Sequence, residues 1–152
     1  MKKAVTLFAC AFVLAILTVA VFADTPVHTY RNGTVWVVGC IRIKPGHDIE
    51  YKTHLATEWR SVEEEEKKQG IILSYRVFVT DDTYGANEWN VLLMKEYKDV
   101  ATLEASREKQ EEIELKLLGG EEQYRKGYDK RELGREIVSQ KLVRELVFES
   151  SK

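Results

Sequence analysis

The stretch VWVVGCIRIKPGHDIEYKTHLATEW, residues 35–59, decides the fold of this chain. Its first ten residues are rich in β-branched side chains. The odd-numbered and the even-numbered positions are both mostly apolar, which is typical of a strand covered on both faces. Pro45-Gly46 ends this strand. The segment that follows has an apolar face at helical spacing, formed by Tyr51, Leu55, Trp59 and Val62. The stretch therefore predicts a strand that turns directly into a helix.

Three more segments have the composition of strands, namely residues 71–80, 88–97 and 137–148. The loop between the first two is short enough for an antiparallel hairpin. A helix capped by Asp99 follows and is broken by Gly119-Gly120, and residues 121–133 indicate another short helix. This order predicts an α+β protein with a ferredoxin-like βαββαβ two-layer sandwich and an extra helical segment before the last strand.

Two polar segments carry local predictions. Asn32-Gly33 is a favoured two-residue hairpin turn, so we expect residues 27–31 to pair with the start of the first long strand. The glutamate run at residues 63–66, followed by Lys67 and Lys68, is expected to be the solvated end of the first helix. Its charges would pair four residues apart, Glu63 with Lys67 and Glu64 with Lys68.

The N-terminus has the pattern of a secretory signal peptide, residues 1–23. Lys2 and Lys3 precede an apolar stretch that ends at Ala23, a small residue of the kind found at cleavage sites. An uncleaved anchor is the alternative, because the apolar run approaches the ~18 residues that span a bilayer. We expect cleavage, which gives a periplasmic or secreted protein without membrane attachment. The mature chain would consist of a lead-in, residues 24–34, and one domain, residues 35–149.

Charge and cysteine content exclude some functions. The 152-residue chain has 23 Lys and Arg against 25 Asp and Glu, and loss of the two leader lysines would make the net charge about −4. Nucleic acid is a poor partner for such a protein, because phosphate contacts require clustered basic side chains. Cys40 would be the only cysteine left, so the mature chain could form no internal disulfide. Its apolar strand indicates a buried inert thiol, with a catalytic thiol as the alternative.

The strands are too apolar for a sheet with one solvated face. Trp36, Tyr75, Trp89 and Leu92 cannot all point toward helices that cover one face of an antiparallel sheet. A second copy of the chain is the simplest cover for the other face. We therefore expect an isologous homodimer.

Three segments carry a family resemblance: IRIKPGHDIEYKTH (residues 41–54), SYRVFVTDDTYGANEWNVLLMKEYKDVATLE (74–104) and KLVRELVF (141–148). Over residues 35–148 the chain resembles the dimeric α+β barrel superfamily, which includes antibiotic-biosynthesis monooxygenase-like, EthD-like and NIPSNAP-like domains, and more narrowly its secreted bacterial members. The resemblance implies a dimer whose two sheets close into a barrel, and a ligand pocket between the helices and the sheet of each subunit. The charged second helix and residues 121–133 depart from the compact family pattern, which leaves open whether this pocket is capped.

His54 is the candidate catalytic residue, a general base beside the apolar face of the first helix. The candidate ligand-binding residues are flat aromatic side chains and two polar side chains that would orient a polar group: Trp36, Tyr51, Trp59, Tyr75, Trp89, Arg76 and Asn90. The alternatives are a helix-flank histidine paired with Glu58 and an ordinary aromatic core. His47, His54 and Glu58 share one stripe of the helix, which is a weak metal signal, and we expect no metal site and no cofactor.

Two classes of function remain open on the sequence. The chain could be a secreted dimeric barrel that binds a small, flat aromatic molecule and converts it without a cofactor, as monooxygenase-like relatives do. It could instead be a non-catalytic dimeric binding or interaction module, which the absence of a convergent acid, base and nucleophile set favours. Haem binding, known for some barrels of the superfamily, is a third option.

Overall fold

The computed structural model describes residues 29–80 and 88–148. The elements in chain order are β1 (Tyr30–Ile43), α2 (Asp48–His54), η1 (Leu55–Trp59), α3 (Arg60–Lys68), β2 (Ser74–Val79), β3 (Val91–Tyr97), α4 (Val100–Ala105), α5 (Arg107–Leu117), α6 (Glu121–Gly134) and β4 (Arg135–Phe148). The expected leader, residues 1–23, lies outside the described residues. The first strand begins within the expected lead-in, at Tyr30.

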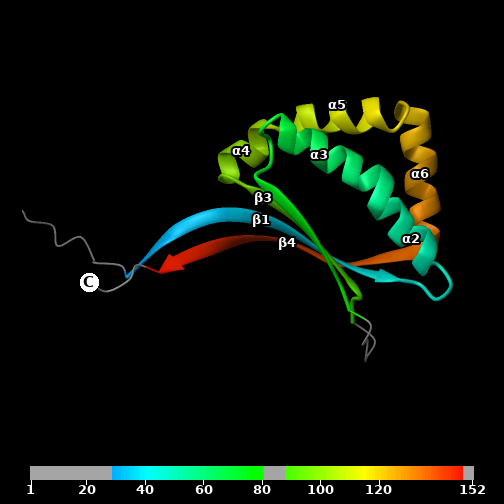
Figure 1. Cartoon of the computed structure of the whole chain (residues 1–152), viewed down its shortest axis with the longest axis horizontal. Helices are drawn as coiled ribbons and strands as arrows, with labels where there is room; N and C mark the ends of the chain where they lie inside the picture. The colour runs from blue at the N-terminus through cyan, green and yellow to red at the C-terminus, as the bar shows by residue number, and fades with distance from the viewer. Residues whose placement is uncertain (1–28, 81–87, 149–152) are drawn as a thin grey trace, which may run out of the picture.

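The four strands form one antiparallel sheet in the order β2-β3-β1-β4. Figure 1 shows the helices on one side of this sheet, with α6 running from the end of α5 back toward β4. This two-layer α+β architecture is consistent with the predicted ferredoxin-like fold, because the central strands β1 and β3 lie between antiparallel neighbours and both helical connections cover the same face. The extra helix expected at residues 121–133 is α6.

The core lies between the helices and one face of the sheet. Alternate residues of β1 point to this face, and Val35, Ile41 and Ile43 are buried there. One cluster of buried side chains consists of Val35, Val62, Ile71, Ile72, Tyr97 and Ile113. A second consists of Ile41, Ile43, Tyr51, Leu55 and Val91, with Trp59 packed against it. The predicted apolar face of the first helix is therefore confirmed as its core face.

The boundaries of the later helices follow the predicted signals. Asp99 caps α4, and its Oδ1 accepts a hydrogen bond from the Thr102 N–H at 2.7 Å. Gly119 and Gly120 have φ angles of 87° and 90°, a conformation that side chains with a Cβ rarely adopt. The chain therefore turns sharply between α5 and α6, which fixes the direction in which α6 returns to the sheet.

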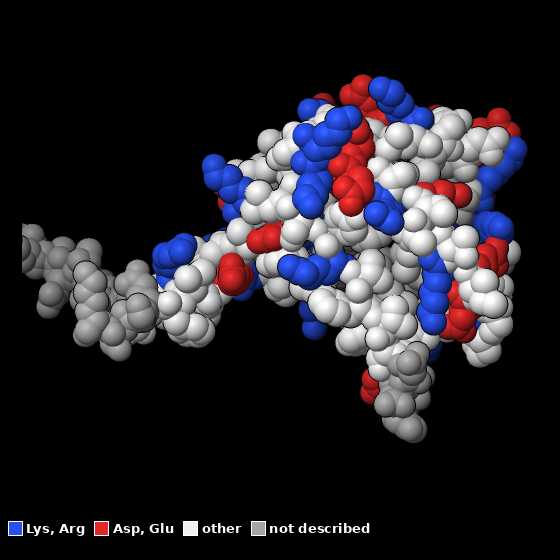
Figure 2. All heavy atoms as spheres, in the orientation of Figure 1, with Lys and Arg blue, Asp and Glu red and all other residues white. Residues whose placement is uncertain are grey.

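Charged side chains cover the helical layer. In the view of Figure 2 they gather over α5 and α6, and many are paired, as Lys126 Nζ is with Glu122 Oε1 at 2.7 Å. No helix of the described residues is long and apolar enough to cross a membrane.

The predicted hairpin turn at Asn32-Gly33 is wrong, because both residues lie inside β1. The strand pairs instead with β4, from Tyr30 opposite Phe148 onward. A Cβ atom on Gly33 would lie 2.5 Å from Glu145 Oε2, so this glycine permits the close approach of β4. Pairing along a 14-residue strand outweighs the local preference of the two residues for a turn.

The prediction of a solvated helix end at residues 63–66 is wrong for Glu63 and Glu66. Glu63 is 2% exposed and Glu66 is fully buried. Lys95 of β3 lies against both, with its Nζ atom 3.1 Å from Glu63 Oε2 and 2.7 Å from Glu66 Oε2. Glu63 stands four residues after Trp59, and Glu66 four after Val62, so both continue the core face of the helix.

The exposed members of the same run also pair differently from the prediction. Lys68 Nζ lies 3.2 Å from Glu65 Oε2, three residues away, and the expected partner Glu64 instead accepts a hydrogen bond from the Tyr75 hydroxyl. Contacts with the sheet therefore determine the charge pairing along α3.

The cluster of Lys95, Glu63 and Glu66 has one ammonium and two carboxyl groups, so it is neutral when one carboxyl keeps its proton. Burial raises the pKa of Glu63 to about 8, with Lys95 opposing the rise and Glu66 adding to it. Burial acts to lower the pKa of Lys95, but the two carboxyl groups outweigh it and the net direction is upward. Glu63 is therefore the group that holds the proton at neutral pH.

Replacing Glu63 should remove a pH dependence of the free energy of unfolding. Above its ordinary pKa of 4.5, Glu63 is ionised in the unfolded chain but protonated in the folded one until about pH 8, so the free energy of unfolding falls through this window. At about 1.4 kcal/mol per pKa unit, the free energy of unfolding of Glu63→Gln, measured by urea unfolding, should rise relative to that of the wild type by on the order of 5 kcal/mol between these limits. The exposed control Glu112→Gln should follow the wild type. Parallel curves for Glu63→Gln and the wild type would contradict the assignment.

Candidate functional site

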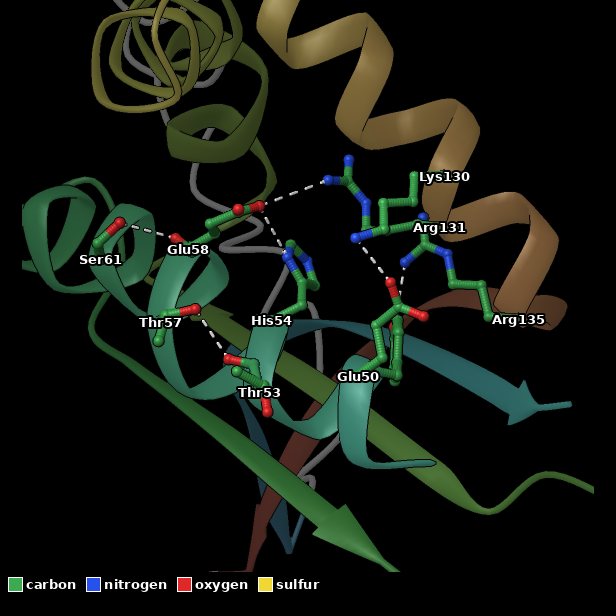
Figure 3. Close-up of polar contacts among 10 residues, drawn as sticks. Glu50, Thr53, His54, Thr57, Glu58, Ser61, Lys130, Arg131 and Arg135 are labelled. Atoms are coloured by element: carbon green, nitrogen blue, oxygen red, sulfur yellow. Dashed lines mark hydrogen bonds and ion pairs between the residues drawn. The ribbon is translucent and has the colours of Figure 1, made fainter. Parts of the chain in front are cut away.

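His54 lies at the junction of α2 and η1, and its side chain is 14% exposed. Its Nδ1 atom is 3.0 Å from Glu58 Oε2, one turn further along the helix (Figure 3). In the neutral imidazole this contact assigns the Nδ1 hydrogen to Glu58 and leaves Nε2 with a lone pair. A histidine held in one tautomer by a carboxylate is arranged to accept a proton.

The segment after His54 is a π-helical turn. At its end the Arg60 N–H donates to the Leu55 carbonyl, five residues back. Turns of this kind are rare and often occur at functional sites. Here the turn contains Glu58 and presents it on the flank of the helix, beside the imidazole.

Two arginines reach this region from α6 and the start of β4 (Figure 3). Arg131 Nη1 lies 4.0 Å from Glu58 Oε2, and Arg135 Nη1 donates to the Tyr51 hydroxyl at 3.1 Å. Their guanidinium groups also lie over the rings of Tyr128 and Tyr51, at 5.8 and 5.6 Å from the centroids. A guanidinium stacked on an aromatic ring keeps its N–H edge available, so this wall is suited to a carboxylate.

Two hollows meet at His54 and Arg131. A cleft of about 290 Å³ lies between α2–η1 and α6, and its lining includes His47, Glu50, Tyr51, His54, Glu58, Lys130 and Arg131. A second hollow of about 180 Å³, which we call the inner cavity, is lined by His54, Trp59, Val62, Glu63, Glu114, Leu118, Tyr124, Tyr128, Arg131 and Arg135. A ligand in either space would contact the same histidine and the same arginine.

The environment keeps His54 neutral. Burial lowers its pKa below the ordinary value of 6.5, and Arg131 lowers it further, while the hydrogen bond to Glu58 opposes both. The imidazole is therefore able to take up a proton at neutral pH. Once protonated, it would be stabilised by the adjacent Glu58 carboxylate.

The structure brings three of the predicted site residues together, namely His54, Tyr51 and Trp59. The rings of Tyr51 and His54 are 6.0 Å apart, and Trp59 lines the inner cavity. Tyr75 contacts Trp59 edge to face at 5.3 Å, but it lines a separate hollow of about 310 Å³ beside β2. Tyr75 is therefore placed to support Trp59.

The other predicted residues do not join this group. Trp36 and Arg76 lie on the sheet face that points away from the helices. Asn90 Oδ1 accepts a hydrogen bond from the Ile43 N–H at 2.8 Å, so its side chain is engaged by the backbone of β1. Trp89 adjoins Asn90 and is not among the residues that line the cleft or the inner cavity.

Several residues that form the site are not among the residues that the sequence predicts for it. Tyr124, Tyr128 and Arg131 are spaced by four and three residues, so they share one face of α6, and Arg135 follows at the start of β4. That spacing was a usable signal. The spacing does not predict which helix this face packs against, because only the folded chain brings α6 against α2.

The histidines and carboxylates of the first helix lie in two separate pairs. Across residues 29–80 and 88–148, no group of three or more His, Cys, Asp or Glu side chains is placed to hold a metal ion. His47 Nδ1 is 3.4 Å from Glu50 Oε2, so the two helical histidines contact different carboxylates. Each carboxylate of the cleft also has a cationic neighbour, since Lys130 Nζ lies 2.7 Å from Glu50 Oε1 and Arg131 Nη1 lies 4.0 Å from Glu58 Oε2.

Comparisons with protein-family models and with curated proteins find no match to this sequence. The structure supports the coarser part of the resemblance, an α+β protein with a four-stranded antiparallel sheet and helices. Because one fold can host many activities, function has to be argued from the site itself.

The two neighbours of His54 should shift its titration in opposite directions. We expect its pKa, measured by NMR, to lie below 6.5 in the wild type, to fall further in Glu58→Gln and to rise in Arg131→Gln. Lys109→Gln, which removes a charge from an exposed position on α5, serves as the control and should leave it unchanged. A wild-type His54 that titrates at or above 6.5 would contradict this description of the site.

Proposed function

We propose that this protein is a periplasmic or secreted small-molecule-binding protein whose ligand is flat, conjugated and anionic, and whose His54 accepts a proton from that ligand. The observation that carries the proposal is the His54–Glu58 pair at 3.0 Å, with Arg131 4.0 Å from the same carboxylate, at a cleft of about 290 Å³. The leader pattern of residues 1–23 supports the location.

The walls of the site explain the choice of ligand. Tyr51, Trp59 and Tyr128 offer flat apolar surfaces, and Arg131 and Arg135 offer guanidinium edges for a carboxylate or phenolate. Proton transfer to a neutral histidine needs no bound cofactor. This fits the expectation, drawn from monooxygenase-like relatives, that the ligand is converted without one.

Binding should depend on the negative charge of the ligand and on Arg131. Benzoate should bind at least about tenfold more tightly than its neutral analogue benzamide, and Arg131→Gln should weaken benzoate binding by a similar factor, because a charge-assisted bidentate contact is lost. Isothermal titration or ligand-observed NMR measures both. Lys109→Gln should bind benzoate like the wild type. Equal affinities for benzoate and benzamide would refute the anion site.

A second candidate function is a dimeric interaction module, and the apolar sheet face away from the helices supports it. The sheet face away from the helices carries Trp36, Val38, Cys40, Leu92, Met94 and Val143, and Phe78 at its margin is 49% exposed. No helix of the described residues packs on this face. We propose that a second copy of the chain covers it, so that two sheets close face to face into a dimeric α+β barrel.

The mature chain should therefore be a dimer in solution. Multi-angle light scattering of residues 24–152 should give twice the chain mass at micromolar concentration. Val38→Asp, which places a charge at the centre of the proposed interface, should give a folded monomer, while Ala101→Asp on an exposed helical position should remain dimeric. A monomeric wild type would rule out the barrel.

A further inference from the structure

The inner cavity brings a proton acceptor and a proton-holding acid to one small space. His54 lines it from the end of α2 and Glu63 from α3, while Arg131 of α6 and Arg135 of β4 complete its wall. We propose that Glu63 is the proton donor that complements His54, and that the site interconverts the keto and enol forms of a small aromatic 2-oxo acid. This inference rests on the function proposed above and names its reaction and substrate class.

The Glu63 side chain lies in the wall of the inner cavity. It lines the cavity although it is only 2% exposed, and its Oε2 atom lies 3.1 Å from the Lys95 ammonium. Lys95 therefore holds one oxygen of this carboxyl group, and the other oxygen, Oε1, is the one from which a ligand in the inner cavity would take a proton.

The groups around Glu63 explain why it can donate. Lys95 and Tyr97 face it from β3, Glu66 from its own helix and Glu114 from α5. Lys95 can neutralise one of the two carboxylates against it, so the other is favoured in its protonated form, in agreement with the pKa of about 8 for Glu63. When Glu63 gives up its proton, Lys95 is in place to stabilise the carboxylate that forms.

The two residues then perform a balanced proton relocation. His54 Nε2 takes a proton from the carbon next to the ketone, and the electron pair of that C–H bond becomes the new C=C bond. The C=O π pair moves to the ketone oxygen, which takes a proton from Glu63. Glu58 balances the imidazolium and Lys95 balances the Glu63 carboxylate, so no oxidant, reductant or cofactor takes part.

The substrate class follows from the positions of the charges. His54, Glu63, Arg131 and Arg135 all line the inner cavity. The carboxylate of a 2-oxo acid would pair with Arg131 or Arg135, and its ketone would then lie near Glu63 and its acidic C–H bond near His54. An aryl group on that carbon makes the enol conjugated and matches the aromatic residues Trp59, Tyr124 and Tyr128. Phenylpyruvate is the simplest probe of this class.

The test follows phenylpyruvate through ultraviolet absorbance of its enol and deuterium exchange at C3 by NMR. The wild type should catalyse both, and His54→Ala and Glu63→Gln should each lose at least about 100-fold in rate, the usual contribution of a general acid or base. Glu112→Gln should keep the wild-type rate. Benzoate binding, measured in parallel, reports whether the cleft of each variant is intact.

A second variant and the pH profile separate a proton donor from a structural acid. The wild-type rate should fall above about pH 8 as Glu63 ionises, and in Glu66→Gln this fall should move to lower pH, because Lys95 then favours ionisation of the remaining Glu63. Binding without exchange in the wild type, or a full rate in Glu63→Gln, would overturn the inference but leave the proposed anion site standing. Failure to bind benzoate or phenylpyruvate would overturn both.

Discussion

The buried contact of Lys95 with Glu63 and Glu66 is the constraint on which the rest of the structure depends. It joins the centre of the sheet to the helix that carries the site, with its Nζ atom 3.1 and 2.7 Å from the two carboxylates. Breaking such a pair costs about 3–5 kcal/mol because a charge is left buried and alone. The contact therefore holds α3 in one position on β3, and α3 in turn sets where η1, His54 and the inner cavity lie.

The return of α6 to the sheet is the second requirement. The turn at Gly119-Gly120 sends this helix from α5 back toward α2, and the Gly134 carbonyl then accepts a hydrogen bond from the Lys44 N–H at the end of β1. Arg131 and Tyr128 line the inner cavity only because α6 follows this path, which Figure 1 shows for the helix as a whole. The helix before the last strand thus supplies Arg131 to the cationic wall of the site.

Much of the fold could be predicted from the sequence, because local signals and the tertiary structure agree there. The strand-to-helix junction, the Asp99 cap and the paired glycines each act within a few residues. The predictions for Asn32-Gly33 and for the glutamate run were wrong for the opposite reason. The environment of these residues is provided by β4 and by Lys95, which are distant in the chain. The same holds for the site, where His54, Glu58 and Glu63 are close in sequence but Arg131 and Lys95 are brought to them by the fold.

The π-helical turn links these two sets of residues. A π turn inserts about one extra residue, so the helix beyond it is rotated by about 100° relative to an uninterrupted α-helix. Counted at 3.6 residues per turn from Tyr51 and Leu55, the core face would next pass close to Glu58. With the inserted residue, Trp59 and Glu66 join Val62 on the core face, and Glu63 is buried beside them. One local irregularity therefore frees Glu58 to orient His54 and buries Glu63 against Lys95, which is why a proton acceptor and a proton-holding acid line the same cavity.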